Sequence, residues 1–163
     1  MTRLDLPRAI ALAARLAESL RRSRTRLAAL FPISGAAVAA LDEPSRTEAD
    51  AFLKRFENLL NHLQDQVFRL IVAAEAGREP GALSRRDIAD YMEKLGVIAD
   101  SDAFFDAVRV RTRLSHVYPD EPDRQAGQLN AAWSAAEVVL AAAETAEAWA
   151  AGRGLSPPPA ASP

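Results

Sequence analysis

The chain has 163 residues, enough for one domain with a hydrophobic core, and its 20 Lys or Arg and 22 Asp or Glu residues leave a formal net charge of −2. This near balance excludes a general electrostatic attraction to nucleic acid, so any such contact has to be local. The absence of cysteine excludes disulfides, thiolate catalysis and cysteine-ligated metal sites. Glycine is sparse at 7 residues while alanine, leucine, arginine and glutamate are abundant, which predicts an all-α fold.

The first predicted helix covers about residues 6–30 and is rich in arginine. Pro7 stands in its first turn, and Pro32 together with Gly35 ends it. Charged residues, beginning with Arg8, interrupt every apolar run, so neither a secretory signal nor a membrane span is expected. We therefore expect a cytoplasmic protein that does not associate with a membrane.

The second predicted helix has the strongest periodic pattern in the sequence. Ser45 followed by Glu48 predicts a capping box at its start. Apolar residues then recur at helical spacing over residues 52–71, and polar residues occupy the opposite face. The glycines and proline within residues 77–81 should end the helix.

Two further helices follow in the middle of the chain. Ser84 with Asp87 predicts a second capping box, and Gly96 is suited to the C-terminal cap of the short helix that this box begins. Asp100 or Ser101 should cap the next helix, which carries several aromatic and aliphatic residues on one face.

Pro119 and Pro122 prevent a continuous helix through the stretch that follows, because proline lacks the N–H group that a helix interior needs. A final long helix should then run to about Gly152. Four or five helices with short connections predict an antiparallel bundle that forms a single domain over residues 1–152. The Pro- and Ala-rich tail, residues 153–163, should be disordered.

One of the two histidines and one of the two tyrosines of the chain lie close to arginines in the stretch RTRLSHVY, residues 111–118. Arg111 and His116 are five residues apart, which places them roughly 140° apart on a regular helix. Their side chains can converge only if the helix ends near His116, as Pro119 favours, or if a second copy of the chain supplies one of them. An imidazole beside a guanidinium suits metal-free RNA cleavage, because histidine can take the proton of a ribose 2′-hydroxyl while arginine neutralises phosphate charge.

These residues resemble a known signature. Arg111, four intervening residues, His116, one spacer and Tyr118 are similar to the arginine–histidine–tyrosine motif of HEPN-domain ribonuclease toxins, the partners of minimal nucleotidyltransferase antitoxins. The stretch YPDEPDRQAGQLNAAW, residues 118–133, also resembles the way a branch of that family enters its last helix. The order of the predicted helices is compatible with the family over most of the chain, so the resemblance implies an HEPN-like helical bundle.

The resemblance further implies a homodimer in which two copies of the motif form one metal-independent endoribonuclease site without a cofactor. Arg111 and His116 would be catalytic, and Tyr118 would be the residue to which the antitoxin attaches AMP. Thr112 departs from the family, in which asparagine is common at this position. The threonine hydroxyl can form a hydrogen bond, but it cannot donate and accept at the same time with the reach of an asparagine amide. The alternative is therefore a degenerate helical module that binds a nucleotidyltransferase or another protein without cleaving RNA.

Other interpretations of individual residues stay open. Arg109 and Arg113 could widen an RNA-binding surface, or they could be ordinary solvated arginines. Asp65 could orient the imidazole of His116, or it could belong to a solvated polar stripe with His62. His116 itself could instead be an ordinary helix-terminal histidine that interacts favourably with the helix dipole and packs beside Tyr118. Two histidines without a shared spacing pattern predict no metal site.

Overall fold

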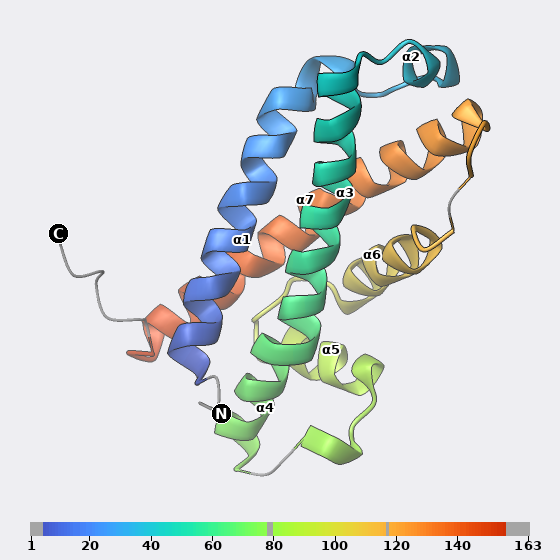
Figure 1. Ribbon diagram of the computed structural model, residues 1–163. Helices are drawn as coiled ribbons and strands as arrows, with labels where there is room; N and C mark the ends of the chain where they lie inside the picture. The colour runs from blue at the N-terminus through green and yellow to red at the C-terminus, as the bar shows by residue number, and fades with distance from the viewer. Residues whose placement is uncertain (1–4, 78–79, 117, 156–163) are drawn as a thin grey trace, which may run out of the picture.

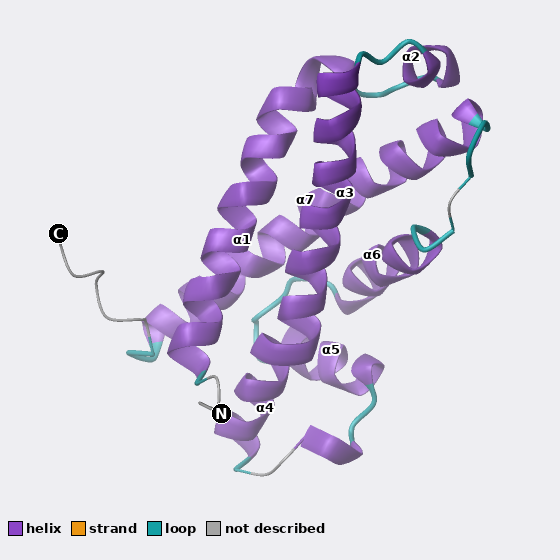
Figure 2. Ribbon diagram, in the orientation of Figure 1, coloured by secondary structure: helices purple, strands orange, loops and turns teal. Residues whose placement is uncertain are grey.

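The computed structural model describes residues 5–77, 80–116 and 118–155, and within these ranges every regular element is a helix, as Figures 1 and 2 show. The all-α prediction is confirmed. The α-helices are α1 (Leu6–Leu27), α2 (Gly35–Ala39), α3 (Glu43–His62), α4 (Phe68–Ala76), α5 (Arg85–Lys94), α6 (Ser101–Arg113) and α7 (Pro122–Gly152). A π-helical segment, η2 (Leu63–Val67), joins α3 to α4, and the short 3-10 helices are η1 (Ala28–Leu30) and η3 (Pro80–Ala82).

The long helices form a bundle. In Figure 1, α1 and α3 run antiparallel side by side, and α7 crosses both and contacts each of them. Helix α6 packs along α7, and α5 packs against α4 and α6 at the lower end of the view. The short helix α2 was not predicted. Ser34 caps it, and its contacts with α7 hold five residues that are too few for a stable isolated helix.

Local capping determines where several helices begin. Asp5 caps α1, Asp100 caps α6, and Ser84 with Asp87 forms the predicted capping box of α5. The predicted box at the start of α3 is wrong. Asp42 is the N-cap there, and its carboxylate accepts a hydrogen bond from the backbone N–H of Ser45 at 2.9 Å.

Glu48, the other residue of that predicted box, instead takes part in a polar cluster between α1 and α3. Its Oε1 accepts hydrogen bonds from the hydroxyl of Ser23 at 2.7 Å and from Arg55 at 2.9 Å, and Arg55 also donates to Ser23. Arg26 lies 3.4 Å from Oε2. The hydrogen bond from Ser23, helped by the two arginines, lowers the pKa of Glu48. Because Ser23 is fully buried, this cluster fixes α1 against α3.

The second predicted helix is not regular along its whole length. Residues 63–67 adopt π-helical hydrogen bonding, which inserts an extra residue into the turn between α3 and α4. Gln64 lies in this segment and is only 3 % exposed, yet neither polar atom of its amide group hydrogen-bonds to a described residue. Periodicity in the sequence does not distinguish such a segment from a continuous α-helix.

The core is built from phenylalanines and small residues. Phe52, Phe56, Phe68 and Phe104 are fully buried, and Phe68 and Phe104 join α4 to α6 with ring centroids 5.1 Å apart. The buried face of α7 consists largely of alanine, which allows its backbone to approach α1 and α3 closely.

The folded region extends slightly beyond the predicted boundary of residue 152. Arg153 pairs with Glu75 at 3.3 Å and covers the ring of Trp149, and Leu155 packs against the core. The rest of the predicted disordered tail, residues 156–163, lies outside the described residues. None of the helices in the described ranges is both long and apolar enough to cross a membrane.

Candidate functional site

Helix α6 ends at Arg113, just before His116. A helix end at this place is one of the two arrangements that would allow the side chains of Arg111 and His116 to converge. The backbone N–H of Leu114 donates to the carbonyl oxygens of Val110 and Arg111, and that of His116 donates to Arg113 at 3.2 Å. This tight turn releases the side chain of His116 from the helix, and the imidazole is exposed to solvent. Val117 lies outside the described residues.

Two glutamines of α7 hold the turn in place. The side-chain amide of Gln128 donates to the carbonyl oxygen of His116 at 3.0 Å and to that of Arg113 at 3.3 Å. The amide of Gln125 donates to the carbonyl oxygen of Tyr118 at 2.9 Å. On the turn itself these bonds use only backbone carbonyl oxygens, so they leave the imidazole and the phenol unengaged by the two glutamines.

The free side chains open onto a pocket of about 280 Å³ between α2, α3, α7 and the turn. We call it the His116 pocket. The ring centroids of His116 and Tyr118 are 6.5 Å apart. The residues that line the pocket are Val38, Leu41, Arg46, Ala49, Asp50, Leu53, Leu114, His116, Tyr118, Gln125, Gln128 and Leu129.

Two charged residues of this pocket, Arg46 and Asp50, were missed by the sequence analysis. They lie one turn apart on α3, and Arg46 Nη2 donates to the carbonyl oxygen of Val38 at 3.2 Å. Their spacing of four residues places them on one helix face, but nothing in the sequence indicates that this face meets the end of α6. That meeting is a property of the tertiary structure.

Tyr118 has a half-buried ring beneath the guanidinium of Arg124, whose central carbon lies 4.9 Å from the ring centroid. Arg124 also pairs with Glu121 at 2.9 Å. The guanidinium therefore packs on the face of the ring as a cation–π contact and helps to fix the orientation of the phenol.

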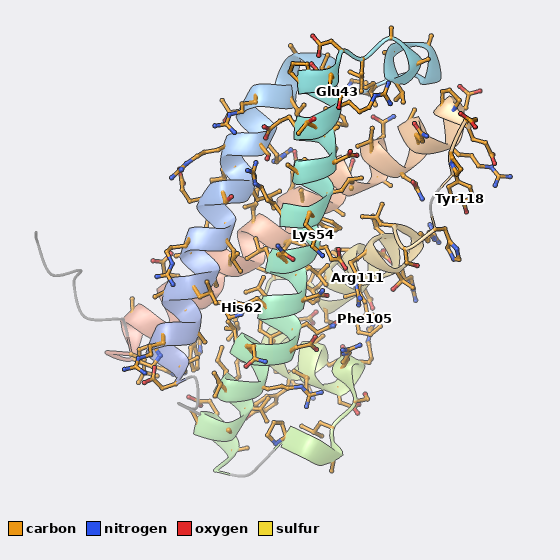
Figure 3. All side chains as sticks on the ribbon, in the orientation of Figure 1. Glu43, Lys54, His62, Phe105, Arg111 and Tyr118 are labelled. Carbon is orange, nitrogen blue, oxygen red and sulfur yellow. The ribbon has the colours of Figure 1, made fainter. Side chains whose placement is uncertain are left out.

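Arg111 is not among the described residues that line the His116 pocket. Its Nε atom is buried and has no hydrogen-bond partner among the described residues. Figure 3 shows Arg111 on α6, whereas Tyr118 lies beyond the end of that helix, in the turn toward α7. Among the described residues, His116 and Tyr118 thus line a common pocket that Arg111 does not line.

The other residues of the motif have different environments. The hydroxyl of Thr112 donates back to the carbonyl oxygen of Val108 at 3.0 Å, so its hydrogen is used within α6. Arg109 pairs with Asp106 at 2.7 Å on the exposed face of the same helix. Arg113 is exposed and borders a neighbouring hollow of about 180 Å³ between α6 and α7.

Asp65 does not orient His116 in the described part of the chain. It lies in the π-helical segment and pairs with Arg85, at the start of α5, at 3.0 Å. The predicted polar network with His62 is likewise absent from the described contacts, since His62 Nε2 lies 2.8 Å from the carbonyl oxygen of Ala9 on α1. Both residues act between helices and not along one helix face.

The described residues contain no group of three or more histidine, aspartate or glutamate side chains placed to hold a metal ion. The side chains that line the His116 pocket offer an imidazole, a phenol, a guanidinium and a carboxylate. No protein-family model matches the chain, and neither the curated proteins nor the solved structures with which it was compared include a match.

Proposed function

We propose that this protein is a metal-independent endoribonuclease of the HEPN type, the toxin component of a toxin–antitoxin pair. The observation that carries the proposal is the exposed imidazole of His116, which opens onto a pocket shared with Tyr118 and Arg46. An imidazole titrates near neutral pH and can act as a general base where a phosphodiester is held beside it.

In the proposed reaction His116 removes the proton of a ribose 2′-hydroxyl, and the resulting oxygen attacks the adjacent phosphorus. The bond from phosphorus to the 5′-oxygen breaks, and that oxygen takes up a proton from solvent. The products are a 2′,3′-cyclic phosphate and a 5′-hydroxyl. DNA is not a substrate, because it lacks the attacking hydroxyl.

The proposal assigns Arg111 to a composite site in a homodimer. A second copy would supply the guanidinium that a single chain does not bring into the His116 pocket. Arg113 is exposed on the same helix and could contact the RNA backbone, whereas Arg109, also exposed, would first have to leave its ion pair with Asp106.

Tyr118 is the proposed site of control by a nucleotidyltransferase antitoxin. Its hydroxyl would attack the α-phosphorus of ATP on that enzyme, with pyrophosphate as the leaving group. The adenylate would then occupy the His116 pocket beside the imidazole and exclude RNA. Intact-mass measurement after incubation with the candidate antitoxin and ATP should show one added AMP, which Tyr118→Phe abolishes.

Two observations favour the second candidate function, a degenerate module that binds a protein partner without cleaving RNA. Arg111 lies outside the pocket, and the Thr112 hydroxyl is bonded within its own helix. Such a module would keep the fold and the surface that binds the partner protein, and it would lack only RNA cleavage.

The deciding experiment incubates structured and unstructured RNA with the purified protein in the presence of a chelator. His116→Ala and Arg111→Ala test the motif, and Arg22→Gln removes a charge from the exposed face of α1 as a control. Cleavage to cyclic-phosphate ends by the parent and by Arg22→Gln, but by neither motif variant, supports the ribonuclease. If none of the four proteins cleaves RNA, the result favours the second candidate function, the binding module without ribonuclease activity.

A further inference from the structure

The His116 pocket contains a guanidinium that does not belong to the motif. We infer that Arg46 binds the phosphodiester that faces His116, so that each chain supplies its own phosphate-binding residue. This inference rests on the proposed function and names a residue of the same site. It assigns the charge-neutralising role within one chain to α3, whereas the motif places it on α6.

The position of Arg46 suits this role. The residue lies in the second turn of α3, lines the pocket together with His116, and is half-buried there. The carbonyl oxygen of Val38, near the end of α2, accepts one of its hydrogen bonds. This bond orients the guanidinium before a ligand arrives and leaves other N–H groups of the planar fork for phosphate oxygens. A phosphate can then be held by two parallel hydrogen bonds.

The neighbouring arginines are placed less favourably. Arg124 packs on the ring of Tyr118 and pairs with Glu121, and Arg113 borders the adjacent hollow between α6 and α7. Arg111 has its Nε atom buried outside the pocket. Among the described arginines, Arg46 is thus the one that lines the same pocket as the imidazole.

Asp50 indicates which kind of phosphate fits. Its carboxylate lines the pocket one turn after Arg46, and the described contacts include no ion pair between the two side chains. A carboxylate repels a multiply charged anion, but it accepts hydrogen bonds from a ribose hydroxyl or a base amino group. The pair therefore fits a singly charged diester with a sugar or base attached, and it disfavours free inorganic phosphate.

The test measures binding without cleavage. The probe is a dinucleoside monophosphate whose 2′-hydroxyl is methylated, so that it cannot be cut. Its binding is followed through the imidazole resonances of His116 by NMR, with the parent protein, Arg46→Gln, Arg46→Lys and Arg22→Gln. Thermal unfolding of each variant checks that it is folded.

We expect Arg46→Gln to raise the Kd of the probe by about ten- to hundredfold, because a hydrogen-bonded pair with a charged group is lost. Arg46→Lys should fall between the parent and Arg46→Gln, since an ammonium keeps the charge without the planar fork. Arg22→Gln should bind within about twofold of the parent, because a screened surface charge contributes little. A probe with an uncharged methylphosphonate linkage should not shift the His116 signals.

The outcomes separate this inference from the proposed function. Equal affinity of the parent and Arg46→Gln, or equal binding of the uncharged probe, overturns the inference even if the protein cleaves RNA. Binding that depends on Arg46, in a protein that cuts no RNA, supports the phosphodiester site and overturns only the ribonuclease. Absence of any His116 shift with the parent protein overturns the inference as well.

Discussion

The two hydrogen bonds between the Asn130 side chain and the backbone of Ile33, called here the Asn130 clasp, allow a direct test of how the candidate site is positioned. The side-chain oxygen of Asn130, on α7, accepts from the backbone N–H of Ile33 at 2.9 Å, and its amide nitrogen donates to the carbonyl oxygen of the same residue at 2.8 Å. Ile33 is only 5 % exposed and lies just before α2. The clasp therefore fixes the segment from which Val38 and Leu41 reach the His116 pocket.

Replacing Asn130 with alanine removes both bonds and leaves a buried backbone donor and acceptor unpaired. Each hydrogen bond contributes about 0.5–1.5 kcal/mol, and an unpaired buried group costs about 1–3 kcal/mol, so we expect a total loss of about 2–4 kcal/mol. For a chain of this length about 2–4 °C of Tm is lost per kcal/mol, which corresponds to about 4–16 °C. Asn130→Asp keeps the acceptor and loses the donor, so it should also destabilise the protein.

Urea and thermal unfolding measure the loss, with Ser134→Ala as the matched control because Ser134 is exposed on the same helix. The control should change stability by no more than about 0.5 kcal/mol. Amide hydrogen exchange provides a local measurement, since the Ile33 N–H should exchange faster in Asn130→Ala. If Asn130→Ala is no less stable than Ser134→Ala, the clasp does not hold α2 and the reasoning is wrong.

Three further predictions concern other contacts. A Cβ atom on Gly35 would lie 1.8 Å from Asp123 Oδ1 and 3.0 Å from its backbone nitrogen, so Gly35→Ala should lower stability by about 1–3 kcal/mol in urea unfolding, with only partial rescue by Asp123→Ala. Because the pKa of Glu48 is lowered in the folded protein, the stability that its carboxylate contributes is present above the unfolded pKa of about 4.3 and is lost as pH falls through the folded pKa. Ser23→Ala should therefore weaken the dependence of the unfolding free energy on pH in the acid range. An unchanged pH dependence would contradict the role given to the Ser23 hydrogen bond. Gln64→Leu should raise Tm, because it replaces a buried amide without hydrogen-bond partners among the described residues by an apolar group, and a lower Tm would show that the amide is satisfied in solution.

Interactions between near neighbours in sequence were the most predictable features. Ser84 and Asp87 form their capping box because both partners lie in one turn, and Asp100 caps α6 for the same reason. The start of α3 was misplaced because the residue that caps it, Asp42, stands three residues before Ser45 and is an equally suitable N-cap residue. Pro44, within the first turn that Asp42 begins, is the signal that separates them.

The features of the candidate site likewise separate into those set by neighbouring residues in the sequence and those set by the packing of distant helices. Pro119 and the following proline favoured a helix end near His116 as one of two possible arrangements, and α6 does end there. His116 and Tyr118 lie close together because only one residue separates them in the chain. Composition and apolar periodicity were enough to predict the all-α class. That Arg46 lines the pocket and Arg111 does not depends on how distant helices pack together. Packing between distant helices selects which polar faces meet, and periodicity along a single helix carries no information about its neighbour.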